Sequence, residues 1–178
     1  FPRLTYDEAM NNYGTDKPDL RFGLEIEDWT EATASLDFGI VRSAVTAGGR
    51  VRGFRLSGGA RLSRRQIEAI ENEAKATGAP GLLWAKCTEE GASGPIGKFL
   101  QPEHVVSMGV QAGDLALVSA GADQVTSPAL AAARMAATAA TVSSSVNVRS
   151  MSIHDNSTSR IVSVALRMMR CESWWTMK

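Results

Sequence analysis

Apolar and polar residues recur with two periods along this chain, about 3.6 residues in some segments and two in others. The clearest helical segment runs from Ser63 to Gly78, where Ile67 and Ile70 fall on one face and polar residues cover the rest. Ser63 and Gln66 have the spacing of a capping box at its start, and Gly78 suits its C-terminal end. This segment is therefore predicted to be an amphipathic helix packed on a sheet.

Near the start of the chain, a helix is predicted over residues 6–13 and a strand over residues 20–28. Thr5 and Glu8 form a second capping box, and Gly14 suits a left-handed helix end. The strand is predicted because apolar residues alternate there with charged residues or glycine. The apolar members of this pattern are Leu20, Phe22, Leu24 and Ile26.

The pattern continues with short elements up to about residue 135, although residues 32–47 are weakly patterned. Strands are predicted in "RVRGFRLSGG" (50–59), "GLLWAKC" (81–87), "GPIGKFL" (94–100) and "DLALVSAG" (114–121). The last of these is apolar on both faces, which indicates a central strand. A helix or helical turn is expected over residues 101–110. An alanine-rich helix is expected to begin with Ser127 as N-cap and Pro128 as its first residue.

This order of elements predicts an α+β fold in two layers, with a mainly antiparallel sheet and helices on one face. The 178 residues fit one domain, or one domain with an appendage. Apolar residues make up 44% and charged residues 21%, so a sizeable core is expected and general disorder is not.

Composition argues against several classes of function. Lys plus Arg and Asp plus Glu number 19 each, so the chain lacks the positive charge of a self-sufficient nucleic-acid binder. Cys87 and Cys171 have no metal or redox spacing, and Cys87 is expected in the core. His104 is expected at the surface rather than as a base. We predict no catalytic residue and no metal ligand. No membrane contact is expected either, because the sequence has no signal peptide and no apolar run of transmembrane length.

Two sets of charged residues are nevertheless candidates for binding. The first lies in the loop "YGTDKPDLRFG", whose charged members either solvate a turn or take part in a junction site: Asp16, Lys17, Asp19 and Arg21. No chemical step is assigned to any of them. The second set is a possible basic face for an RNA backbone, consisting of Arg50, Arg52, Arg55, Arg61, Arg64 and Arg65.

The amino-acid sequences of two regions resemble a known family. Residues 1–31, "FPRLTYDEAMNNYGTDKPDLRFGLEIEDWTE", closely resemble bacterial and organellar aspartate-tRNA ligases where the class II catalytic domain gives way to a large insertion. The resemblance continues through "GGRVRGFRLSGGARLSRRQIEAIENEAKATGAPGLLWAKC", "GPIGKFL" and "GDLALVSAGAD", which are similar to the inserted GAD domain. It implies a DCoH-like fold. It also implies a catalytic-core end and hinge at 1–31, a GAD domain at 32–135 and a divergent tail at 136–178.

The resemblance implies that the parent protein joins aspartate to tRNA with ATP and Mg²⁺, as a homodimer in the cytoplasm or an organelle. Motifs 1, 2 and 3 of that family do not occur in this chain. We therefore expect a fragment that binds no cofactor and does not activate aspartate by itself, and whether to call it an enzyme stays open. The alternative is a non-catalytic tRNA-binding or accessory GAD module, as in tRNA-dependent amidotransferases. A third possibility is that the domain only braces its parent.

Residues 136–178 depart from the family, which has a hydrophobic strand at this point. This stretch is rich in serine, arginine and methionine and ends close to Trp174 and Trp175. We expect it to arise from a frameshift, an aberrant splice or a gene-model error, and not to belong to the fold. A basic helix over residues 160–170 that touches lipid or acidic partners is the less favoured reading.

Overall fold

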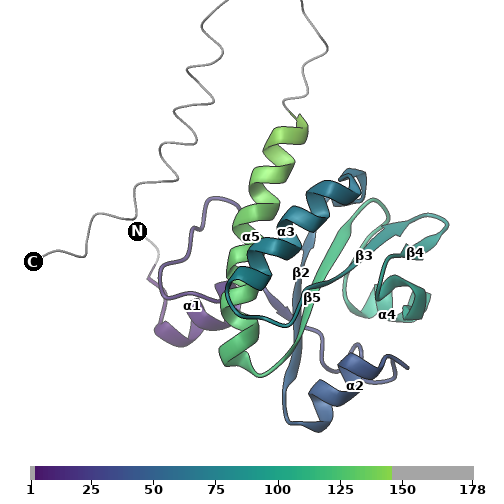
Figure 1. The fold of residues 1–178 in the computed structure, drawn as a ribbon, viewed down its shortest axis with the longest axis horizontal. Helices are drawn as coiled ribbons and strands as arrows, with labels where there is room; N and C mark the ends of the chain where they lie inside the picture. The colour runs from purple at the N-terminus through teal and green to yellow at the C-terminus, as the bar shows by residue number, and fades with distance from the viewer. Residues whose placement is uncertain (1–2, 146–178) are drawn as a thin grey trace, which may run out of the picture. The chain divides into compact units, whose positions relative to one another are not determined.

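A computed structural model describes residues 3–145, with side chains to residue 141, and shows a five-stranded sheet packed against helices (Figure 1). The strands are β1 (Glu27–Asp28), β2 (Arg50–Leu56), β3 (Leu83–Thr88), β4 (Gly91–Ser93) and β5 (Leu115–Gly121). The helices are α1 (Tyr6–Tyr13), α2 (Gly39–Thr46), α3 (Arg64–Ala76), α4 (Pro102–Ser107) and α5 (Asp123–Ser145), with 3₁₀ turns η1 (Gly59–Arg61) and η2 (Gly97–Phe99). The predicted α+β class is confirmed.

All strand pairs are antiparallel, in the order β1-β2-β5-β3-β4. β5 lies in the centre and pairs with β2 from Arg50 opposite Gly121 to Leu56 opposite Leu115. The central position that its apolar sequence predicts is confirmed, because β5 pairs with β2 along one edge and with β3 along the other.

Successive residues of β5 point into two separate cores. Leu115 and Leu117 pack beneath α3 and α5, which lie side by side over one face of the sheet (Figure 1). Ala116 and Val118 belong to a second cluster on the other face, which contains Val41 of α2 and residues next to η2 and α4. The two long helices thus cover one face, as expected, and shorter elements cover the opposite face.

Helix ends are the best predicted features. At α1 the Thr5 hydroxyl accepts the Glu8 amide at 3.2 Å, while the Glu8 carboxylate accepts the Thr5 amide at 2.8 Å. Gly14 has the expected left-handed conformation, with φ of 73°. At α3, Ser63 and Gln66 make the equivalent pair of bonds. The side chains of Ile67, Ile70 and Ala74 are buried, as predicted.

The predicted strand over residues 20–28 is wrong, since only Glu27 and Asp28 pair in the sheet. Leu20 and Phe22 are more than a third exposed, so the alternating pattern does not mark a buried face there. Asp19 accepts the Arg21 amide and side chain, which holds a turn. Beyond it, Gly23 and Leu24 both have positive φ, so the chain bends where a strand would run straight.

Three further expectations need correction. "GPIGKFL" forms η2 rather than a strand, and the chain pairs earlier as the short β4, where Gly91 and Gly94 adopt positive φ.

The last helix begins at Asp123, four residues before the expected N-cap Ser127. Pro128 lies inside its second turn, where it removes only one hydrogen bond, and the Ser127 side chain accepts from Arg52 instead. α2 was missed in the weakly patterned stretch, because its N-cap Phe38 has no capping side chain.

His104 is buried rather than exposed, which corrects the surface assignment. Its Nδ1 accepts the Gln101 amide at 3.0 Å, and its Nε2 lies 2.8 Å from the Ser35 hydroxyl, so both ring nitrogens have partners inside the fold. Cys87 is buried as expected, and this burial raises the pKa of its thiol.

α5 continues past Met135 to Ser145, and its residue Ala137 is fully buried in the core beneath α3. The remainder of the predicted tail, from residue 146, lies outside the described residues, as do Cys171 and the possible basic helix over residues 160–170. Among residues 3–145, no helix combines the length and hydrophobicity needed to cross a bilayer.

We expect Gly53→Ala to destabilise the fold strongly. A methyl group there would lie 2.5 Å from Cζ3 of Trp29 and closer still to the Leu117 carbonyl oxygen, so the sheet must shift. The expected loss is about 2–3 kcal/mol in the free energy of unfolding, measured with urea. Gly39→Ala is the matched control, because no atom lies within 4 Å of its added methyl group. Equal stability of the two variants would contradict this packing.

Candidate functional site

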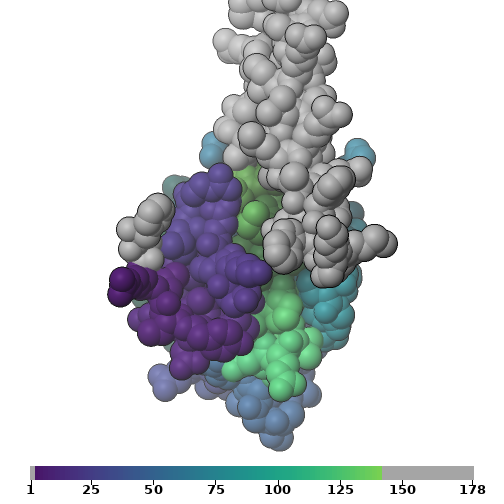
Figure 2. All heavy atoms as spheres, turned by 90° about the vertical axis from the view of Figure 1, so that its left-hand side faces the viewer, coloured from purple at the N-terminus to yellow at the C-terminus, as the bar shows by residue number. Residues whose placement is uncertain are grey.

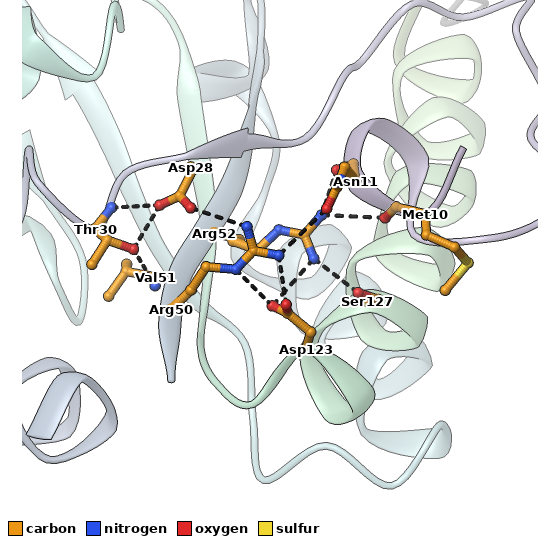
Figure 3. Close-up of polar contacts among 9 residues, drawn as sticks. All are labelled: Met10, Asn11, Asp28, Thr30, Arg50, Val51, Arg52, Asp123 and Ser127. Atoms are coloured by element: carbon orange, nitrogen blue, oxygen red, sulfur yellow. Dashed lines mark hydrogen bonds and ion pairs between the residues drawn. The ribbon is translucent and has the colours of Figure 1, made fainter. Parts of the chain in front are cut away.

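The first component of the candidate site is Arg52, whose side chain lies on the helix-covered face of β2 and is almost fully buried. One terminal nitrogen donates to the Ser127 hydroxyl at 2.8 Å (Figure 3). The other donates to the carbonyl oxygens of Asn11 and, at 3.3 Å, Met10. The Asp123 carboxylate lies 3.6 Å away and balances the charge. Arg52 therefore links β2 with α5 and the end of α1.

The second component is Arg134 of α5, which is 3% exposed. Its guanidinium donates to the carbonyl oxygens of Leu24 at 2.5 Å, Gly23 at 3.2 Å and Tyr13 at 3.5 Å. It also lies over the Tyr13 ring at 4.8 Å from the centroid. The Tyr13 hydroxyl donates in turn to Glu25 at 2.9 Å. Arg134 thus fixes both ends of the loop between α1 and β1.

Together the two arginines complete the C-terminal end of α1. The last four carbonyl groups of a helix have no partner inside it. Here the Met10 carbonyl accepts the Gly14 amide at 3.1 Å as well as Arg52, which also bonds Asn11. The Ile26 amide donates to Asn12 at 2.7 Å, and Arg134 reaches Tyr13. Positive charge is also favourable at this end of a helix dipole.

Burial lowers the pKa of both Arg52 and Arg134, since desolvation disfavours the charged form. An arginine stays protonated despite this shift, because its ordinary pKa is above 12. The energetic cost of burying these cations is offset by their hydrogen bonds and by neighbouring carboxylates. Both residues therefore act as fixed multi-donor groups rather than as acids or bases.

Arg50 forms a more exposed layer outside Arg52. It donates to both oxygens of Asp123, at 2.5 and 3.0 Å, and to Asp28 at 3.3 Å (Figure 3). The hydrogen bond with Asp123 raises the pKa of Arg50. Asp28 also accepts from the amide and hydroxyl of Thr30, whose hydroxyl accepts the Val51 amide. This network ties β1 to β2 and to the start of α5.

The junction loop itself divides into an ordered pair and two outward residues. Asp19 and Arg21 form an ion pair, and the hydrogen bonds from Arg21 lower the pKa of Asp19 to about 2. The side chains of Asp16 and Lys17 are exposed and make no ion pair within the described part of the chain. Figure 2 shows the purple and dark blue N-terminal segment lying directly against the green α5. Only Asp19 and Arg21 are therefore fixed by contacts with each other, and the four residues do not converge on a common centre.

The six candidate arginines do not form one face. Arg50 and Arg52 are engaged in the network above, and Arg55, on the opposite face of β2, bonds the Gly109 carbonyl. The remaining three follow one another at η1 and the start of α3, and all are exposed: Arg61, Arg64 and Arg65. Only this group stays available for an RNA backbone.

Sequence reasoning missed Arg134 and Asp123. Arg134 falls in the stripe of α5 that packs on the sheet, next to Leu130, Ala133 and Ala137. A charged residue in an otherwise apolar stripe is a signal of a buried, bonded group. Asp123 had no such signal, because its role depends on where β2 lies.

Comparison with known proteins agrees with this geometry. The family model of the GAD domain matches residues 41–130, which span α2 to the first third of α5. The chain belongs to the GAD domain family. The resemblance stated from the sequence is therefore confirmed, and the matched region is the insertion of bacterial aspartate-tRNA ligases.

Relatives of this GAD protein are similar over a longer stretch than the domain itself. The aspartate-tRNA ligase of Shouchella clausii is 42% identical over 140 residues, which cover 76% of this chain and 24% of the relative. The aspartate-tRNA(Asp/Asn) ligase of Syntrophomonas wolfei is 44% identical over 128 residues, covering 70% and 22%. That of Thermoanaerobacter sp. strain X514 is 39% identical over 139 residues, covering 76% and 24%. The chain thus spans about a quarter of the length of these relatives.

We expect Arg134→Met to release the junction loop of the GAD protein. Three carbonyl groups would lose their donor, at a cost of about 3 kcal/mol in the free energy of unfolding. At short labelling times, hydrogen-deuterium exchange should rise over residues 14–26 while β5, whose amides exchange through global unfolding, stays protected. Arg65→Met is the control, because this exposed residue should change stability by less than about 0.5 kcal/mol. Unaltered exchange over residues 14–26 would refute the anchoring role.

Asp19 gives a pH dependence of known sign. Its folded pKa of about 2 lies below the unfolded value of about 3.9, so its stabilisation is present above pH 4 and lost as pH falls through 2. Since Arg21 is largely exposed, we expect Asp19→Asn to cost only about 1 kcal/mol at pH 5. The difference between variant and parent should fall by about half at pH 3, as measured by urea unfolding. A difference independent of pH would show that the ion pair contributes nothing.

Proposed function

We propose that this chain is the junction and insertion portion of an aspartate-tRNA ligase, and that it acts there as a rigid non-catalytic arm. In this role α1 and the junction loop continue the catalytic core of the parent, and the GAD sheet is held at a fixed angle to them. Aspartate, ATP and tRNA would be substrates of the parent, which we expect to be a homodimer in the cytoplasm or an organelle.

The observation that supports this proposal is the direction in which Arg52 and Arg134 point. Both are buried within the body formed by the elements from β2 to α5, here called the GAD body, and both donate to carbonyl groups of the segment before it. A domain joined to its neighbour by a loose tether needs no such contacts, because linkers are commonly polar and make few contacts. Similarity to the ligases extends over 140 residues, beyond the stretch that the GAD model covers, which supports a shared junction.

Chemistry in the parent would come from residues outside this chain. Aminoacyl transfer with ATP needs cations that neutralise the triphosphate. Within residues 3–141, no group of three or more His, Cys, Asp or Glu side chains is placed to hold a metal ion. The exposed arginines of α3, Arg64 and Arg65, lie at a helix surface.

A second candidate function is tRNA binding by the GAD body alone. It is favoured by the exposed arginines at η1 and α3, of which Arg65 makes no ion pair within the described residues. Arg64 is partly committed, since it pairs with Glu68 at 3.0 Å and lies over the Trp84 ring. The zero net charge of the chain weighs against strong autonomous binding.

The test is a pair of assays on the purified chain. We expect no aspartate-dependent exchange of pyrophosphate into ATP above background, and no shift of a bacterial aspartate tRNA transcript at 150 mM salt. Exchange above background would refute the non-catalytic proposal. A salt-sensitive shift that Arg61→Ala/Arg65→Ala abolishes, and that the control Arg42→Ala retains, would establish the binding module instead.

A further inference from the structure

A small hollow is lined by residues of the β3–β4 hairpin and α4. Figure 1 shows these elements at the opposite edge of the sheet from α1. The volume of the hollow is about 330 Å³. The buried side chains of Cys87 and Leu100 line its floor, and Val105 and Val106 line the side formed by α4. Val106 is 78% exposed, the largest fraction among the large apolar residues of the described chain. The hollow is thus an apolar surface open to solvent.

The rim of this hollow is acidic. Glu89 and Glu90, at the turn between β3 and β4, line it, and no lysine or arginine does. Neither carboxylate forms a hydrogen bond or ion pair with any other residue of the described chain. Two unpaired negative charges therefore border an unfilled apolar surface.

We propose that this hollow, formed by Cys87, Leu100, Val105 and Val106 and bordered by Glu89 and Glu90, is a docking site for a basic protein segment. The segment would place one aliphatic or aromatic side chain in the hollow and a neighbouring lysine or arginine against the two carboxylates. The apolar anchor gains by leaving water, and the charge pair selects the partner and its register.

Charge decides the class of the partner. An RNA backbone carries one negative charge per nucleotide and would be repelled by Glu89 and Glu90. The exposed arginines on α3 come from a different part of the chain, so the two surfaces are suited to partners of opposite charge. The hollow, at about 330 Å³, has room for a large apolar side chain. A basic peptide segment fits both this volume and the charge of the rim.

The test is selection of a random 12-residue phage-displayed library on the full chain, followed by fluorescence anisotropy with the synthetic peptide of highest enrichment. We expect peptides that pair an aliphatic or aromatic residue with a lysine or arginine nearby. Val106→Asp should weaken binding at least tenfold by placing a charge at the hollow. Glu89→Lys/Glu90→Lys should weaken it to a similar extent and reduce its dependence on salt.

Two controls keep this result specific to the hollow. Val45→Asp changes an exposed valine on α2, and Glu73→Lys changes an exposed carboxylate on α3, so both should leave the peptide affinity within twofold. Circular dichroism should show all four variants folded, because each substitution is at a solvent-accessible position. Enrichment of no peptide family, or of peptides whose affinity is unchanged by the hollow variants, would overturn the proposal. Binding of a tRNA transcript that requires Val106 would also overturn it.

Discussion

The structure depends on how the carbonyl groups at the end of α1 and in the following loop find donors away from water. A helix end that packs against a sheet leaves polar groups that cost free energy unless they are bonded. Arg52 and Arg134 supply these bonds from two different elements, β2 and α5. Because each guanidinium carries five donors in a rigid plane, one side chain can bond several carbonyls at once, which a lysine cannot match.

This arrangement explains why the junction and the GAD body form one structural unit. β1 contributes only two residues to the sheet, which is too short to hold the N-terminal segment by backbone pairing alone. The remaining attachment comes from side chains: the buried arginines, the Arg50 network with Asp28 and Asp123, and the Trp29 side chain in the second core. This attachment links the fold to the proposed role as a rigid arm, because a segment held on several sides fixes the orientation of the sheet relative to it.

The sequence allowed good prediction of elements whose ends carry a local chemical signal. Capping boxes at Thr5 and Ser63 located α1 and α3, whereas α2 has no capping side chain and was missed. Alternation over residues 20–28 was misleading, because the chain turns at Asp19–Arg21 and bends at Gly23 and Leu24, whose carbonyl groups accept from the distant Arg134. Arg52 was grouped with RNA-facing residues. The alternation of side chains along a strand places it on the same face as the apolar Phe54, and both are buried. The partners of buried arginines could not be predicted, since they depend on tertiary packing.

The central claim is that residues 5–28 and the GAD body move as one rigid unit. Backbone ¹⁵N relaxation of the full chain tests it most directly, because it reports the rotational correlation time of each segment. If Arg52 and Arg134 anchor the segment, α1, β1, β2, β5 and the part of α5 that precedes residue 142 share one correlation time. A shorter correlation time for residues 5–28, with low order parameters in the junction loop, would show that the arginines do not anchor it.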